Sequence, residues 1–76
     1  MKRIIATIQK RENVYICIGD GSLAGGYRFG EIRQFTRDSD GTLTPTQKGF
    51  TFTPDALPGI IAGLEQLRKR FLENNP

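Results

Sequence analysis

The spacing of the apolar residues changes once along this chain of 76 residues, at Pro54. Before Pro54 the apolar residues form short runs, rich in β-branched side chains and bounded by polar residues or glycine, and such runs predict strands. The predicted strands are 4–8, 14–18, 27–37 and 42–53. From Pro54 onward the apolar residues recur at steps of three and four, which predicts one amphipathic helix. They are Leu57, Ile60, Ile61, Leu64, Leu67, Phe71 and Leu72.

The segments between the predicted strands are short. Residues 38–41 have the Asp-Ser-Asp-Gly composition of a hairpin turn, and residues 19–26 read as a flexible glycine-rich loop. Pro45 favours an edge position for the fourth strand, because proline cannot donate to a ladder. We therefore expect an antiparallel meander covered on one face by the helix.

The predicted fold class is α+β, a four-stranded antiparallel sheet followed by one C-terminal helix. One domain spans residues 1–76, with the strands in 1–53 and the helix in 54–74. A domain of this size buries only about 60–65% of the surface that its unfolded chain exposes, so dimerisation would stabilise it. Gly59, Ala62 and Gly63 form a strip of small residues where two helices could approach closely, and we predict the dimer interface there.

The composition excludes most classes of enzyme. The chain has no histidine and one cysteine, Cys17. It therefore lacks the residues for zinc hydrolysis, Ser-His or Cys-His catalysis, an internal disulfide or a multi-cysteine metal site. The glycine loop lacks the lysine of a phosphate-binding loop, so we interpret it as a connector. We expect no catalytic activity, no metal and no cofactor.

The excess of positive charge lies in the predicted strands. Residues 1–53 hold eight basic and five acidic side chains, whereas residues 54–76 hold three of each. This distribution suggests an anionic partner for the strand region. No apolar run approaches the about 18 residues that cross a bilayer, and no signal-peptide core is found. We therefore expect an intracellular protein with no membrane partner.

The third predicted strand carries aromatic and basic residues in alternation. The residues that share one of its faces are Tyr27, Phe29, Glu31, Arg33, Phe35 and Arg37. Aromatic rings between arginines are typical of single-stranded nucleic-acid binding, because bases stack on rings while arginines neutralise phosphates. The rings could equally be core residues packed under the helix. The alternation leaves both interpretations open.

Residues 32–54 resemble the C-terminal domain of the positive cofactor 4 family of transcriptional coactivators, in the short bacterial or phage form. The likeness rests on Ile-Arg-x-aromatic at 32–35, the acidic hairpin at 38–41, Pro-x-x-Lys-Gly at 45–49 and the proline that opens the helix. The resemblance implies a dimer of curved antiparallel sheets, each backed by a helix. It implies that single-stranded DNA binds along the β-ribbons.

The resemblance also implies site residues. Arg33 and Lys48 match basic DNA-contacting positions, and Phe35 matches an aromatic on the same strand. Thr36 stands where a base-stacking tryptophan is found, Gln47 replaces an arginine, and residues 21–22 replace an aromatic-lysine pair. Other basic and aromatic residues could compensate for these losses. The full set of expected nucleic-acid-binding residues is Arg33, Lys48, Phe35, Arg28, Arg37, Gln47, Thr36 and Gly49.

The expected function is sequence-tolerant binding of single-stranded DNA by a homodimer that acts in transcription, replication or repair, with that machinery as a further partner. Binding of RNA or melted duplex by the same basic face is one alternative. A protein-interaction module is another. The location implied is the cytoplasm, associated with the nucleoid, for a bacterial or phage protein, and the nucleus for a eukaryotic one.

Overall fold

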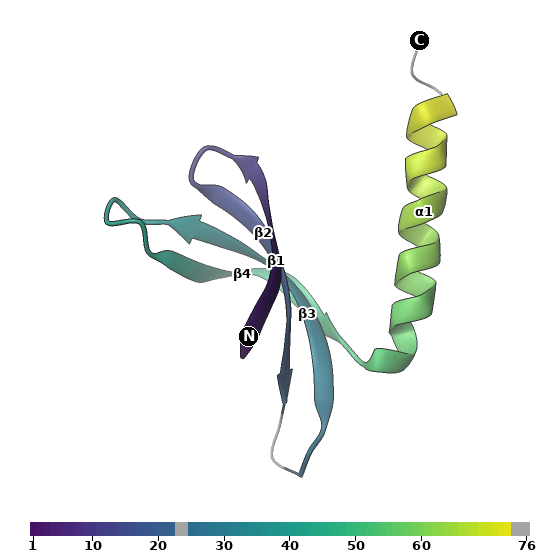
Figure 1. Ribbon diagram of the computed structural model, residues 1–76, viewed down its shortest axis with the longest axis horizontal. Coiled ribbons are helices and arrows are strands. Elements are labelled where there is room, and N and C mark those ends of the chain that lie inside the picture. The colour runs from purple at the N-terminus through teal and green to yellow at the C-terminus, as the bar shows by residue number, and fades with distance from the viewer. Residues whose placement is uncertain (23–24, 74–76) are drawn as a thin grey trace.

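The computed structural model describes residues 1–22 and 25–73. Its elements are β1 (Arg3–Arg11), β2 (Val14–Ser22), β3 (Arg28–Arg37), β4 (Leu43–Phe52), the single turn η1 (Pro54–Ala56) and the helix α1 (Leu57–Glu73). The strands form one antiparallel sheet in the order β1-β2-β3-β4 (Figure 1). The predicted fold class is confirmed.

The hairpin between β3 and β4 forms where the sequence predicts it. The N–H of Gly41 donates to the carbonyl of Asp38 at 2.9 Å, and the N–H of Thr42 donates to Oδ1 of Asp40 at 3.0 Å. Gly41 has a φ of 88°, which glycine adopts without steric cost. β4 is an edge strand, as Pro45 indicates.

The prediction of a loop from residue 19 is wrong, because β2 continues to Ser22. Gly19 pairs with Glu31 and Gly21 pairs with Phe29. The ring of Phe29 fills the space that a side chain at Gly21 would need, so this glycine packs under an aromatic neighbour in the ladder. Residues 23, 24 and 74, which the predicted loop and helix include, lie outside the described residues.

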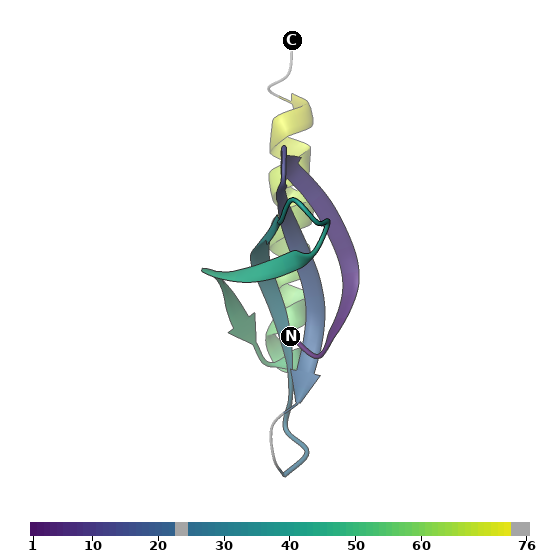
Figure 2. The ribbon, with the colours of Figure 1, turned by 90° about the vertical axis from the view of Figure 1, so that its left-hand side faces the viewer.

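The buried core is small and lies on one face of the sheet. Tyr15, Cys17 and Phe35 are its buried hydrophobic residues, and Leu43 packs against them. Tyr15 and Phe35 are direct neighbours across β2 and β3. The strands curve strongly, as Figure 2 shows. These residues are buried against one another and against Leu43.

The expectation that the helix covers one face of the sheet is wrong for the single chain. α1 contacts η1 and extends away from the strands (Figure 1). Only Thr53 separates the end of β4 from η1, which leads directly into α1. No helix in the described part of the chain is long and apolar enough to cross a membrane.

Candidate nucleic-acid interface

A β-bulge interrupts the pairing of β3 with β4. Arg33 lies opposite Gly49, whereas Phe35 lies opposite Pro45. Three residues of β4, 46–48, therefore face one residue of β3. Extra residues in a bulge bend the strand that carries them. Bulges of this kind re-aim side chains at the edge of a sheet.

Hydrogen bonds fix the shape of this bulge. The hydroxyl of Thr46 donates to the carbonyl of Gln34 at 2.7 Å, and it accepts from the N–H of Lys48 at 3.2 Å. Gln47 and Lys48 are exposed at the outside of the bulge. Lys48 is therefore exposed on a stretch of backbone that the Thr46 hydroxyl holds in place.

Gly49 permits the close approach of the two strands beside the bulge. A Cβ at this position would lie 2.6 Å from the carbonyl oxygen of Ile32 and 2.7 Å from Cα of Arg33. Both distances are too short for a real contact, and both neighbours are backbone atoms. The close approach of the strands thus explains why a glycine follows Lys48, because a larger residue at position 49 would not fit beside the bulge.

Arg33 is held in place beside the bulge. Its Nε donates to Glu31, two residues earlier on the same face, and its Nη1 donates to the carbonyl of Thr46 at 2.9 Å. The carboxylate of Glu31 is buried and also lies 3.3 Å from the N-terminal ammonium group of Met1. The hydrogen bond from Arg33 and the nearby ammonium hold the pKa of Glu31 below its usual value, against the opposing effect of burial.

Arg37 lies at the hairpin end of β3. Its guanidinium carbon is 4.7 Å from the centre of the Tyr15 ring, within the range of a cation–π contact. The side chain is exposed. Arg37 and Lys48 are thus exposed cations of the β3–β4 ribbon, and Arg33, which is partly exposed, pairs with Glu31 beside the bulge.

The structure separates the predicted site residues into groups. Arg33, Gln47, Lys48 and Gly49 come together at the bulge. Thr36 and Arg28 occupy even positions of β3, so their side chains leave the face that carries Arg33.

The aromatic residues of β3 are mostly packed. Phe35 is 6% exposed in the core, and Phe29 is half-buried over Gly21. Phe35 is a core residue, as one of the two interpretations has it, but it packs with Tyr15 and Cys17 and not under the helix. Its ring is therefore not exposed to a base in the single chain. Tyr27, just before β3, is 74% exposed.

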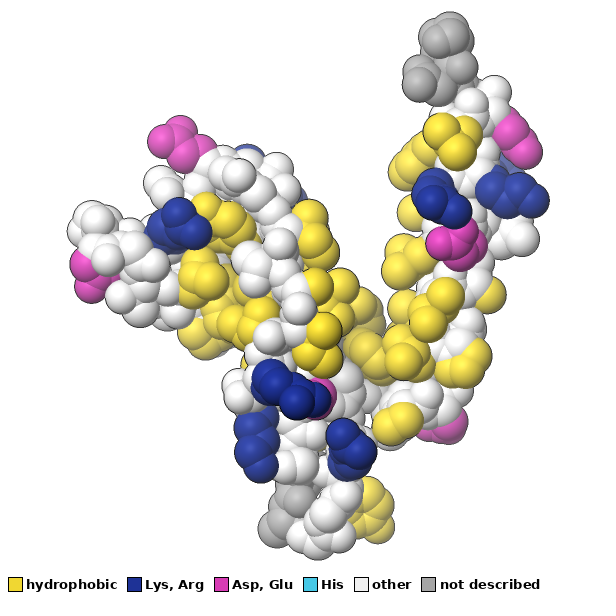
Figure 3. Space-filling model, viewed as in Figure 1, with side chains coloured by type: hydrophobic (Ala, Val, Ile, Leu, Met, Phe, Trp, Pro, Cys, Tyr) yellow, Lys and Arg dark blue, Asp and Glu magenta, His cyan; other side chains and the backbone are white. Residues whose placement is uncertain are grey.

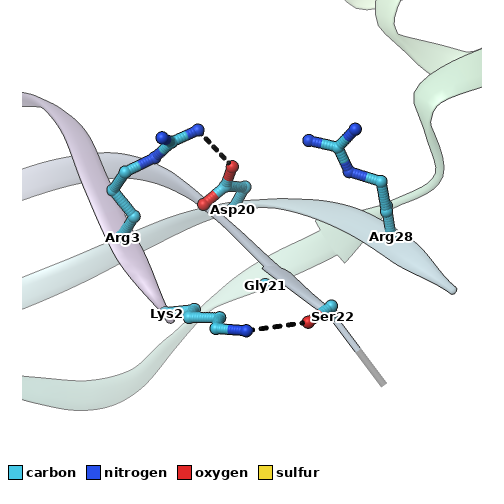
Figure 4. A pocket seen from close by; sticks show the side chains of 6 residues that line it. All are labelled: Lys2, Arg3, Asp20, Gly21, Ser22 and Arg28. Atoms are coloured by element: carbon cyan, nitrogen blue, oxygen red, sulfur yellow. Dashed lines mark hydrogen bonds and ion pairs between the residues drawn. The ribbon is translucent and has the colours of Figure 1, made fainter. Parts of the chain in front are cut away.

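A second group of basic side chains lies at the other end of the sheet. Lys2, Arg3 and Arg28 line an open hollow of about 490 Å³ together with Asp20, Gly21 and Ser22 (Figure 4). The sequence analysis named Arg28 and missed Lys2 and Arg3. The signal that could have found them is the register, because the antiparallel pairing of the first two strands brings residue 3 beside residue 20.

The predicted interface strip lies on the exposed helix. At Gly59 and Gly63 a Cβ would meet no atom within 4 Å, other than the helix backbone itself. With about 100° of rotation per residue, the strip of Gly59, Ala62 and Gly63 lies roughly opposite the apolar side of α1. Among residues 1–22 and 25–73, no three histidine, cysteine or carboxylate side chains gather as metal ligands would.

The chain is similar to solved structures of BPSL1147, a PC4 homolog from Burkholderia pseudomallei K96243. In its orthorhombic crystal form the match has a TM-score of 0.81 and 30% identity, and it covers 87% of this chain and 88% of that one. In the tetragonal form the TM-score is 0.78, again at 30% identity, with 87% and 96% covered. Neither the protein-family models nor the curated proteins gave a match.

Proposed function

Since this chain belongs to the family of PC4 homologues, we propose that it binds single-stranded DNA along the β3–β4 ribbon. The observation that carries the proposal is the bulge, which presents Lys48 beside Arg33 on a fixed backbone. An arginine already held by hydrogen bonds loses little side-chain entropy when it meets a phosphate. Lys48, on its flexible stem, adds a point charge that can follow the strand.

The proposed contacts are made to the backbone of the nucleic acid. Arg33, Arg37 and Lys48 are suited to phosphates, and phosphate contacts carry no sequence information. A threonine stands at position 36, and the Phe35 ring is buried, so stacking on β3 contributes little. Tyr27, which is 74% exposed, is the ring we propose as a stacking surface. Binding is therefore sequence-tolerant and largely electrostatic.

We propose that the chain forms a homodimer. Large hydrophobic residues are exposed both on the sheet face opposite the core and along α1. In Figure 3 the hydrophobic side of the helix is turned mainly toward the sheet, and the space between them is open. The exposed residues are Ile5, Ile8 and Phe50 on the sheet, and Leu57, Ile61, Leu64, Leu67, Phe71 and Leu72 on the helix.

A second copy of the chain is the occupant that suits this space. The apolar sheet face and the apolar helix side belong to the same chain, so two copies related by a two-fold axis can each cover the other's surfaces. A domain of this size also needs more buried surface than it has alone. The strip of Gly59, Ala62 and Gly63 is a further proposed contact, where helices could meet on their other side.

We assign no catalytic role to the chain. The proposed action is that of a coactivator-like protein in transcription, replication or repair, inside the cell and on the nucleoid of a bacterial or phage system. Fluorescence anisotropy with labelled oligo-dT, a matched duplex and a matched RNA tests the proposal. We expect the tightest binding to oligo-dT. Equal affinity for all three would replace single-strand binding with general nucleic-acid binding, and no binding would favour a protein-interaction module.

A further inference from the structure

The hollow at the end of β2 and β3 gathers more positive charge than its surroundings can neutralise. Arg3 Nη2 lies 2.9 Å from Oδ2 of Asp20, and Lys2 Nζ donates to Oγ of Ser22 at 3.4 Å. Arg28 makes no ion pair within the described part of the chain. Three cations and one carboxylate therefore line the hollow, which leaves it with an excess of two positive charges.

The backbone holds these side chains together. The N–H of Lys2 donates to the carbonyl of Asp20 at 2.7 Å, Arg3 pairs with Asp20 across β1 and β2, and Arg28 pairs with Ser22 across β2 and β3. Figure 4 shows the guanidinium groups of Arg3 and Arg28 on either side of Asp20, extending in the same direction, with Lys2 alongside Ser22. The cations thus come from adjoining rungs of the ladder and line one hollow.

We propose that Lys2, Arg3 and Arg28 form a second phosphate-binding site, which takes a backbone phosphate of the same nucleic-acid strand or of a second segment. This inference rests on the proposed function. Two planar guanidinium groups, an ammonium group and a hydroxyl supply the donors that phosphate oxygens accept. Asp20 competes with the phosphate for Arg3.

The site is distinct from the bulge. Arg28 and Arg33 are five positions apart on β3, or about 17 Å at the rise of a strand, and alternation points them to opposite faces of the sheet. A ligand at the bulge and one at the hollow therefore contact different backbone amides. The amides of Gly21 and Ser22 report on the hollow, and that of Gly49 reports on the bulge.

Backbone amide NMR shifts of the full chain, followed during titration with oligo-dT, test the proposal. We expect Gly21, Ser22 and Gly49 all to shift. A shift at Gly49 without one at Gly21 or Ser22 overturns the second site and leaves the proposed function intact. If oligo-dT moves none of them, the proposed function fails. Inorganic phosphate then decides the hollow: a shift at Ser22 supports a phosphate site there, and no shift overturns it.

Two variants test the assignment of the side chains. Arg28→Gln should abolish the Ser22 shift and flatten the salt dependence of oligo-dT binding by about 0.7 per protomer. Its control is Arg68→Gln, which removes a guanidinium paired with Glu65 on α1, far along the chain from the hollow. If Arg28→Gln keeps both the shift and the slope of the parent, Arg28 is not part of a phosphate site.

Asp20→Asn should bind oligo-dT a few-fold more tightly, because it frees Arg3 from a competing exposed ion pair. A purely structural role for Asp20 predicts no gain in affinity. Asp55→Asn on η1 removes the same charge away from the hollow and is the matched control. Equal gains in the two variants would attribute the effect to net charge and contradict the site.

Discussion

Gly49 lies directly opposite Arg33 in the β3–β4 ladder, and a Cβ at residue 49 would come within 2.7 Å of Cα of Arg33. This contact explains why glycine follows lysine at the bulge. The backbone of β4 passes so close to β3 that no side chain fits between them. The position of Lys48 therefore depends on the absence of a Cβ at Gly49.

Gly49→Ala should destabilise the fold and displace the lysine. The added methyl group would lie against the backbone of Ile32 and Arg33, which cannot move aside as a flexible side chain could. We therefore expect the free energy of unfolding to fall by about 1–3 kcal/mol. Chemical denaturation measures this loss. Gly59→Ala is the control, because its Cβ meets no atom within 4 Å beyond its own helix, and alanine favours a helix by about 1 kcal/mol over glycine. Equal stability of Gly49→Ala and the parent would contradict the close approach.

Substitution of Phe35 should lower the stability of the fold and leave the salt dependence of oligo-dT binding unchanged. Its ring packs against Tyr15 in a core with few buried residues. Phe35→Leu is expected to lower the free energy of unfolding by about 1–3 kcal/mol, while the salt dependence of oligo-dT binding stays that of the parent. Thermal melts and salt titrations on the same samples separate the two effects. Weaker binding with an unchanged melting curve would instead place the ring on the nucleic acid.

The order of elements could be predicted from the sequence because it depends on local patterns. The change of period at Pro54 separates strands from helix, and the Asp-Ser-Asp-Gly segment forms its turn from its own side chains. These features need no knowledge of the tertiary contacts. The Lys-Gly pair of the predicted site lies at the bulge, where Gly49 is opposite Arg33.

Other features depend on partners that are distant in sequence. The glycines of β2 read as a loop, but Gly21 pairs within the ladder and lies under the ring of Phe29. The same alternation fits a binding face or a core, and only the tertiary contacts of Phe35 with Tyr15 and Cys17 show that its ring is buried while Arg37 stays exposed. The direction of α1 could not be predicted either, since its apolar residues fit any covering surface.

Acid should weaken the fold partly through Glu31. Its hydrogen bond from Arg33 lowers the pKa of this carboxyl in the folded state, so the folded chain binds fewer protons than the unfolded one. The contribution of Glu31 to stability is present above the pKa of the unfolded chain, and it is lost as the pH falls through the lower pKa of the folded chain. Glu31→Gln should show a flatter fall in stability over that range of pH, measured by urea denaturation. If the stability of the variant falls with pH as steeply as that of the parent, Glu31 does not contribute to acid unfolding.

Leu64→Asp should break the proposed dimer, because it puts a charge on the apolar side of α1, where Leu64 is 57% exposed in the single chain. Sedimentation should give twice the 8.5 kDa of the chain for the parent and one chain for the variant. A parent of 8.5 kDa at micromolar concentration would contradict the dimer.

Gly63→Leu tests the strip of small residues separately. If helices approach closely at the strip, the larger side chain should shift the dimer toward monomer. An unchanged mass would remove the strip from the interface and leave the apolar side as the contact.

The salt dependence of oligo-dT binding tests the central claim most directly, with Lys48→Ala compared against the parent and against Arg68→Ala as the control. If six basic groups of a dimer contact phosphates, the logarithmic slope should be roughly −4, from about −0.7 per neutralised phosphate. Lys48→Ala should flatten it by about 1.4, one group from each protomer, while Arg68→Ala keeps the slope of the parent. Lys48 is exposed, so the variant should fold as the parent does. A slope unchanged by Lys48→Ala would contradict the proposed site, and no salt-dependent binding at about 50 mM salt would contradict the function.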